Sequence, residues 1–144
     1  MLPFSGIFPF RIPGRRPFRV DLMEVLQFEP MSKTVLIVSY NPELLSPHKQ
    51  ILTEAGYEVR ECGSLSAALG AVGPGKTDLL VLSPDIPVGD RRRMEAEAKR
   101  RNQNIRIVLF CEGEKVKDVF ASATLLLSEA PAALVETAGR LLSP

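Results

Sequence analysis

The hydrophobic pattern of the chain centres on one short apolar run, residues 79–82, which Asp78 precedes and Ser83, Pro84 and Asp85 follow. Four apolar residues without alternation, bounded by turn residues, predict a strand that is buried on both faces. Strands of this kind lie in the middle of parallel sheets, and ligands bind where such strands end. The sequence therefore predicts that Ser83 lies at the mouth of the functional site.

Strand-like and helix-like patterns alternate along the rest of the chain. The predicted strands span residues 33–38, 57–61, 78–83, 105–110 and 123–127. Apolar residues at helical spacing predict helices over residues 44–55, 65–72, 91–101, 115–121 and 130–142. This alternation implies a parallel sheet with helices on both faces. We therefore expect an α/β fold, in which a doubly wound five-stranded sheet is the middle of three layers.

Candidate capping residues mark where the predicted helices begin. Asn41 and Pro42 predict the start of the first helix, and Pro47 falls early enough to be tolerated in its first turns. Ser64 is the candidate cap of the second helix, and Asp90 is that of the third. These signals predict helix boundaries that the structure can test.

The third predicted helix is strongly charged, with six basic and two acidic residues between positions 91 and 101. Glu95 with Lys99, and Glu97 with Arg101, have the favourable i,i+4 order for ion pairs. We interpret this helix as a solvated face with internal salt bridges. A docking surface for nucleic acid would need more than one helix of charge.

The composition excludes several classes of protein. The 144 residues suit one domain, 45% of them are hydrophobic, and the formal net charge is +1. No overall field therefore attracts nucleic acid or a membrane. No apolar run approaches the roughly eighteen residues that indicate a transmembrane helix. We expect neither a nucleic-acid partner nor a membrane partner.

Cysteine and histidine usage indicates neither a disulfide scaffold nor a metal site. Cys62 and Cys111 are too few for a disulfide framework and favour a reducing compartment, so we expect a cytoplasmic protein. Cys111 has no activating partner in its motif, and we interpret it as a core residue. The single His48 has no second ligand at metal-binding spacing, so we expect it to be solvated on the surface.

The first thirty residues differ from the rest, since they hold five of the twelve prolines and five of the seven phenylalanines. The prolines prevent a persistent helix or interior strand. One interpretation is a disordered arm, and another is that the natural chain begins at Met31. A third is an arm that docks its aromatic side chains on a partner or on its own domain. The domain itself is predicted over residues 31–144.

Residues 70–77 match the phosphate-loop pattern G-x-x-x-x-G-K-[ST]. A functional phosphate loop needs a strand before it and a helix after it, so that backbone N–H groups point at the phosphates. Here a predicted helix comes first and a predicted strand follows. We therefore reject nucleotide binding at this segment and interpret it as a glycine-rich turn.

Residues 33–142 resemble the receiver domains (CheY-like) of two-component response regulators. The resemblance is most specific in residues 35–43, 51–59 and 64–69, and in residues 78–83 followed by Pro87. It implies a flavodoxin-like sheet of strand order 2-1-3-4-5. It also implies a phosphorylation site at the carboxyl ends of the strands, as in a phosphorelay.

Every signature position of such a site is altered in this chain. Where receivers have an acidic pair that binds Mg²⁺, this sequence has Ser39 and Tyr40. Ser83 stands at the phosphoacceptor position, four residues before the proline. Cys111 matches the family's threonine or serine, and Ser128 matches its lysine. The resemblance therefore implies the location of the site and not its chemistry.

The substitutions remove the groups that phosphoryl transfer to an aspartate needs. Mg²⁺ prefers carboxylate ligands, which Ser39 and Tyr40 do not supply. A serine such as Ser83 is a poor nucleophile without a neighbouring base, and no lysine remains to neutralise a phosphoryl group. Asp85 is an alternative acceptor, provided that the turn at Pro84 leaves it pointing toward the site.

We therefore expect a degenerate receiver, or pseudo-receiver, that is not an enzyme, needs no cofactor and signals by protein contact. The resemblance implies a partner face formed by the fourth helix, the fifth strand and the fifth helix, residues 115–142, and leaves a homodimer open. One alternative is a phosphorelay receiver that uses Asp85. Another is a small ligand-binding or enzymatic flavodoxin-like domain, which the absence of glycine from residues 39–42 argues against.

Overall fold

The computed structural model describes residues 33–73, 76–115, 118 and 120–143. The predictions for residues 1–30, and for a chain start at Met31, fall outside the described residues and stay predictions. None of the helices that the structure describes is both long enough and apolar enough to cross a membrane.

The described residues form a five-stranded parallel sheet between two layers of helices. The strands are β2 (Thr34–Val38), β3 (Glu58–Cys62), β4 (Leu79–Leu82), β5 (Arg106–Cys111) and β6 (Ala123–Leu126). The helices are α4 (Ser46–Glu54), α5 (Leu65–Ala71), α6 (Val88–Arg101) and α7 (Ala132–Leu142). All strand pairs are parallel in the order β3-β2-β4-β5-β6. The predicted fold class and the strand order 2-1-3-4-5 are therefore confirmed.

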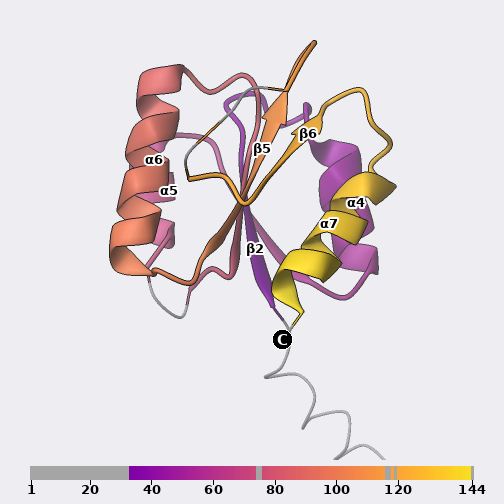
Figure 1. Ribbon diagram of the computed structural model, residues 1–144, viewed down its shortest axis with the longest axis horizontal. Helices are drawn as coiled ribbons and strands as arrows, with labels where there is room; N and C mark the ends of the chain where they lie inside the picture. The colour runs from indigo at the N-terminus through magenta and orange to yellow at the C-terminus, as the bar shows by residue number, and fades with distance from the viewer. Residues whose placement is uncertain (1–32, 74–75, 116–117, 119, 144) are drawn as a thin grey trace, which may run out of the picture. The chain divides into compact units, whose positions relative to one another are not determined.

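Each face of the sheet has its own apolar core, because side chains alternate along every strand. Figure 1 shows α5 and α6 on one side of the sheet and α4 and α7 on the other. The core on the α5–α6 side includes Leu36, Val38, Leu80, Leu82, Met94, Ala98, Ile107, Leu109 and Cys111. The core on the α4–α7 side includes Val35, Ile37, Leu45, Leu52, Leu79, Val81, Val108, Phe110, Leu134 and Ala138. The central strand β4 is buried throughout, as its unbroken apolar run predicts.

The helix α4 begins later than predicted, at Ser46 instead of position 44. Pro47 lies at its N-terminus, where its missing N–H removes no helical hydrogen bond. Asn41 forms a separate turn before the helix: its side-chain oxygen accepts the N–H of Glu43 at 3.2 Å, and its carbonyl accepts the N–H of Leu44 at 3.0 Å. Asn41 therefore accepts local hydrogen bonds as a cap would, but these bonds stabilise the turn before α4 and not the helix itself.

The other two capping predictions have different outcomes. The Ser64 hydroxyl accepts the N–H of Ala67 at 3.2 Å, which confirms Ser64 as the cap of α5. The helix α6 begins at Val88, after Pro87, and no side chain caps it by a hydrogen bond. Asp90 lies within its first turn, where an acid still interacts favourably with the helix dipole.

The predicted helix over residues 115–121 is wrong for the described part of that segment. Lys115, Asp118, Phe120 and Ala121 are not helical. The Asp118 carboxylate instead accepts the N–H groups of Phe120 at 2.9 Å and Ala121 at 3.2 Å, a local bond that competes with a helix. The described residues thus contain four helices, and the predicted partner face includes β6 and α7, preceded by the four non-helical residues just named.

The predicted surface position of His48 is also wrong. Its side chain is buried in the α4–α7 core, edge-on to Phe110 with 4.9 Å between ring centroids. Neither ring nitrogen has a hydrogen-bond partner within the described residues, and burial lowers the pKa of the imidazole. His48 is spaced between Leu45 and Leu52 on the apolar stripe of α4, which is the sequence signal for its burial.

One predicted ion pair on α6 is confirmed and the other is wrong. Arg101 lies 2.6 Å from Glu97, as predicted. Lys99 does not pair with Glu95, because its ammonium donates to the carbonyl of Ile105 at 2.7 Å. Glu95 is buried instead, since it lies next to Met94 and one turn before Ala98 on the core face of the helix.

Candidate functional site

The parallel strands bring Ser39, Ser83 and Cys111 to the same edge of the sheet, at the ends of β2, β4 and β5. Backbone hydrogen bonds continue past the strands: the N–H of Ser39 donates to the carbonyl of Cys62, and the N–H of Ser83 donates to that of Val38, each at 3.1 Å. Ser83 is 1% exposed. Ser83, which stands at the phosphoacceptor position of receiver domains, is thus a fully buried serine at the carboxyl end of the central strand.

Asp85 turns back over this edge and connects two loops. The hydroxyl of Ser83 donates to its carboxylate. The same carboxylate accepts the backbone N–H of Asn41 at 2.7 Å and, more weakly, that of Tyr40 at 3.4 Å. The turn at Pro84 therefore leaves the Asp85 side chain pointing toward the site, which is the orientation that the sequence left open. We call Ser83, Asp85 and these two backbone N–H groups the strand-end cluster.

Tyr40 connects the strand-end cluster to the first turn of α6. Its hydroxyl donates to Asp90 at 2.8 Å. Burial, the hydrogen bond to Asp90 and the charges of Asp90 and Asp85 together raise the pKa of Tyr40 to about 12. The phenol therefore stays protonated near neutral pH and acts as a donor to Asp90, so it offers no anionic oxygen to a cation.

Two of the remaining signature positions, Ser39 and Cys111, take structural roles. The Ser39 hydroxyl donates to the carbonyl of Asn41 at 2.5 Å. Cys111 is buried in the α5–α6 core, and both it and Cys62 are free thiols. Ser128 is exposed.

Glu129 has a structural role that the sequence analysis missed. Its carboxylate accepts the N–H of Leu126 at 2.7 Å, and its own N–H donates to the Leu126 carbonyl at 3.0 Å. These bonds cap the last residue of β6, which is the outermost strand of the sheet in the part of the chain that the structure describes. The acid two or three residues beyond a short apolar strand is the signal that could have identified the cap.

The donor set at the strand ends does not fit Mg²⁺. Mg²⁺ prefers carboxylate oxygens in octahedral geometry, and Ser39 and Tyr40 contribute neutral hydroxyl groups. Asp85 is the carboxylate nearest to Ser83, and it already accepts three hydrogen bonds from the protein. No group of three or more His, Cys, Asp or Glu side chains suited to a metal ion occurs among the described residues.

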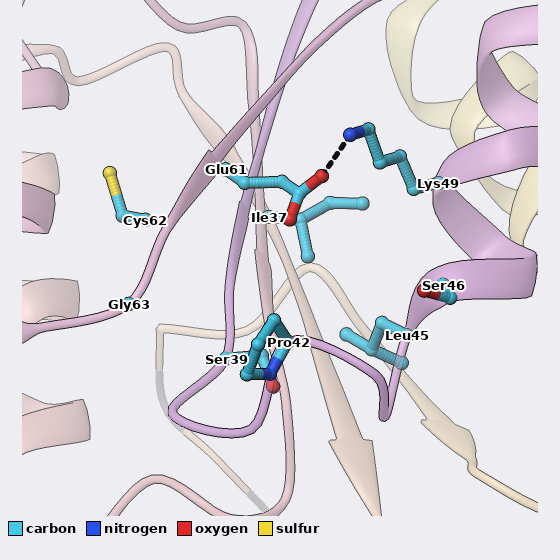
Figure 2. A pocket seen from close by; sticks show the side chains of 9 residues that line it. All are labelled: Ile37, Ser39, Pro42, Leu45, Ser46, Lys49, Glu61, Cys62 and Gly63. Carbon is cyan, nitrogen blue, oxygen red and sulfur yellow. Dashed lines mark ion pairs between the residues drawn. The ribbon is translucent and has the colours of Figure 1, made fainter.

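A small cavity lies beside the site, between β2, β3 and α4, and Figure 2 shows its lining. Its volume is about 110 Å³, well below the roughly 300–1,000 Å³ of sites that enclose drug-sized ligands. Ile37, Pro42 and Leu45 give it an apolar wall, and Lys49 forms an ion pair with Glu61 across it. Because Glu61 already neutralises Lys49, the cavity offers no unpaired charge to a ligand.

The phosphate-loop pattern has the order that the sequence analysis used to reject it. The helix α5 ends at Ala71, before the pattern's lysine, and β4 begins at Leu79, after it. Thr77 donates through its hydroxyl to the carbonyl of Ala71 at 2.8 Å. The hydroxyl that would hold Mg²⁺ in a phosphate loop is therefore used to cap the end of a helix.

Comparison with known proteins identifies solved structures whose fold is similar to that of this chain. No protein-family profile matches the chain, and neither does any curated protein. Among solved structures, a response regulator receiver domain protein (CheY-like) from Methanospirillum hungatei JF-1 is 19% identical with a TM-score of 0.64, over 76% of this chain and 92% of the other. The chemotaxis response regulator CheY4 of Vibrio cholerae is 21% identical with a TM-score of 0.66, over 77% and 99%.

A third similar structure is the response regulator TrrA from Thermotoga maritima, in complex with Mg²⁺ and BeF. It is 24% identical to this chain with a TM-score of 0.67, over 76% of this chain and 99% of TrrA. TrrA has also been solved in complex with the histidine kinase ThkA. These similarities show that residues 33–143 have the fold of CheY-like receiver domains.

Proposed function

We propose that this chain is a degenerate receiver domain that signals through protein–protein contact, without catalysis and without phosphorylation of an aspartate. The observation that supports this most is the strand-end cluster, in which the carboxylate of Asp85 is held by Ser83, Tyr40 and Asn41. A phosphoryl group would have to break these contacts, and Ser39, Tyr40 and Ser128 stand where receivers have the acidic pair and the lysine that stabilise it.

The contacts of Asp85 have a second consequence in this proposal. They join the end of β4 to the loop between β2 and α4, and Tyr40 extends the connection to Asp90 on α6. Three segments that flank the site are thus held in one arrangement by the protein's own side chains. The domain presents a fixed surface to its partner instead of a phosphorylation-dependent one.

The partner face in this proposal is the one formed by β6, α7 and the segment before β6. Two large apolar side chains are conspicuously exposed among the described residues, Val88 at 54% and Phe120 at 39%, and Phe120 lies within this face. Exposed aromatic side chains are enriched at the centres of protein interfaces. Complex formation by TrrA with a histidine kinase supports a protein partner for this fold, and a second copy of this chain is one candidate. The free thiols of Cys62 and Cys111 suit a cytoplasmic location.

The test is an amide-resolved NMR titration of the full chain with Mg²⁺, followed by Mg²⁺ with beryllofluoride as a phosphoryl mimic. We expect no saturable shifts at Ser39, Tyr40, Ser83 or Cys111 at millimolar Mg²⁺. TrrA, which has been solved with Mg²⁺ and BeF, is the positive control under the same conditions.

The same titration separates the alternatives. Saturable shifts at these residues that the D85N variant abolishes would replace our proposal with a phosphorelay receiver that uses Asp85. Saturable shifts that persist in D85N would instead indicate a ligand-binding site that does not depend on this carboxylate. Unchanged spectra of this chain, alongside a response in TrrA, are the result that our proposal predicts.

A further inference from the structure

A second cluster of charged side chains lies buried between α6 and the segment before β6. The side chains of Glu95 and Asp118 are 1% and 5% exposed, and that of Arg91 is 14% exposed. Arg91 Nε lies 3.8 Å from Glu95 Oε2 and 3.5 Å from Asp118 Oδ2. One guanidinium therefore faces two buried carboxyl groups, and we call these three residues the α6 cluster.

The two carboxyl groups of the α6 cluster differ in their hydrogen bonds. Asp118 Oδ1 accepts the N–H groups of Phe120 and Ala121. Glu95 Oε2 is buried without a hydrogen-bond partner among the described residues, although it lies near the same Arg91 Nε that faces Asp118. If both carboxyl groups were ionised, the single guanidinium would leave one buried negative charge uncompensated, and a direct hydrogen bond between the two groups is possible only when one of them holds a proton.

The surroundings determine which group holds that proton. Burial, together with the hydrogen bond and charge of Asp118, raises the pKa of Glu95 to about 8. Burial alone would raise the pKa of Asp118, but its bonds to Glu95 and to backbone N–H groups, with the charge of Arg91, hold it below its ordinary value. Glu95 is therefore the donor and Asp118 the acceptor.

Among the residues that the structure describes, few other charges face the pair. Arg92, on the same helix, is exposed and acts with Arg91 to favour ionised Glu95. The helix α5 and the strand β4 contribute no titratable side chain. The strand β5 contributes the exposed Arg106 at its start and the buried Cys111 at its end. The described residues Glu112, Glu114 and Lys115 of the segment after β5 are exposed.

We propose that Glu95 and Asp118 share a single proton that fastens Asp118, and with it the backbone of Phe120 and Ala121, to α6. Loss of this proton in mildly alkaline solution leaves two buried negative charges opposite one guanidinium and releases Asp118. The proton moves from the Glu95 carboxyl group to hydroxide in the solvent, and no other bond is made or broken. This device is independent of phosphorylation and of the strand-end cluster.

Asp118 is the member of the pair that moves when the two carboxyl groups separate. Met94 and Ala98 anchor α6 in the core on either side of Glu95, and both are fully buried. Asp118 belongs to no helix or strand. Phe120, which is already 39% exposed, follows Asp118 by two residues, so the protonation state of Glu95 controls an apolar side chain on the proposed partner face.

The test is solvent exchange of the Phe120 and Ala121 amides, measured by NMR on the full chain from pH 6 to pH 9 and expressed as protection factors. Above pH 8 we expect protection to fall by up to about tenfold per pH unit, the limit for release of one proton. In E95Q, whose side-chain amide imitates the protonated acid and still donates to Asp118, we expect less than a twofold change. E97Q is the matched control, since Glu97 is a partly exposed acid on the same helix, and it should behave as the unmodified chain does.

A second variant keeps the test decisive if E95Q folds poorly. In D118N the amide oxygen still accepts the N–H groups of Phe120 and Ala121, but the negative charge beside Glu95 is gone. The loss of protection should then move to lower pH, together with the titration of the Glu95 carboxyl carbon. The proposal would be overturned if the protection factors of these amides in the unmodified chain did not change with pH. It would also be overturned if E95Q or D118N lost protection above pH 8 in the same way as the unmodified chain.

Discussion

Asp85 lies just before α6 and Glu95 lies within it, yet the carboxyl oxygens of these two acids differ in exposure and in hydrogen bonding. Asp85 is exposed and accepts hydrogen bonds from one hydroxyl and two backbone N–H groups. Glu95 is 1% exposed, and one of its oxygens has no hydrogen-bond partner among the described residues. Contacts to fixed donors hold a loop in one place, whereas contacts that need a proton last only as long as the proton does.

Because of this difference, we expect the strand-end cluster to keep one arrangement and the α6 cluster to change with pH. At the strand ends, where the resemblance implies a switch, the side chains form contacts that require neither metal nor phosphate. In the α6 cluster, two carboxyl groups and one guanidinium have a balance of charge that depends on pH. The fold is that of receiver domains, and our two proposals together assign a fixed arrangement to the strand ends and a change of state to the α6 cluster.

The largest effect should come from removing Arg91, whose guanidinium faces both acids of the α6 cluster. R91A takes this cation away from two buried carboxyl groups, and we expect it to lower the free energy of unfolding by about 3 kcal/mol, as for other broken buried pairs. Urea denaturation at pH 7 measures the change. R92A removes an exposed arginine from the next position and should change stability by less than about 0.5 kcal/mol; equal effects of the two variants would contradict the comparison.

The pH dependence of stability sharpens the comparison further. The pKa of Glu95 is raised to about 8 in the folded chain, so between its ordinary value and pH 8 the folded state binds a proton that the unfolded state has lost. The contribution of Glu95 is therefore fully present in acid and declines as pH rises toward 8, with a limiting slope of about 1.4 kcal/mol per pH unit. Urea denaturation from pH 5 to pH 9 should show this decline in the unmodified chain and not in E95Q.

The other face of the sheet should show the opposite pH dependence. Burial against Phe110 lowers the pKa of His48, so the unfolded state binds a proton more readily than the folded state does. The contribution of His48 is present above its ordinary pKa and declines as pH falls below about 6.5. H48L should remove this acid-side loss and leave the alkaline decline intact, as measured by thermal unfolding between pH 4.5 and 9. If the stability of H48L falls at acid pH as much as that of the unmodified chain does, the loss arises from groups other than His48.

The smallest effect should come from the strand-end cluster, because Asp85 is exposed. D85N keeps an acceptor but loses the charge, and we expect a loss of about 1 kcal/mol in the free energy of unfolding. The amide resonances of Tyr40 and Asn41 should shift, and those of Phe120 and Ala121 should not. E43Q replaces an exposed acid in the adjacent loop and is the matched control. A response of Phe120 to D85N would show that the two clusters are coupled.

The sequence predicted most of the fold because its signals are local and periodic. The unbroken run of β4 is short and bounded by turn residues, which favours a buried strand, and the spacing along α7 favours an amphipathic helix. The conformation at Phe120 and Ala121 could not be predicted in the same way, since their N–H groups are held by the Asp118 carboxylate, which itself lies against Arg91 of α6. Helical spacing alone does not reveal that such a partner exists.

The candidate site was predictable in position and less so in detail. Strand ends follow from the parallel sheet, so the sequence alone places Ser39, Ser83 and Cys111 there. The contacts of Asp85 depend on the path of the turn after Pro84, which the sequence leaves open. The burial of Glu95 and His48 was signalled by their positions on apolar helix stripes, but their polar character argued for the surface.

The most direct test of this account is one series of amide-resolved NMR spectra of the full chain from pH 6 to pH 9, recorded with and without Mg²⁺. We predict that the Tyr40 and Asn41 resonances stay unchanged along both axes, while those of Phe120 and Ala121 shift with pH through a single transition near pH 8. A Mg²⁺-dependent shift at Tyr40 and Asn41, with static resonances at Phe120 and Ala121, would contradict the account, because it would place the changeable part of the domain at the strand ends.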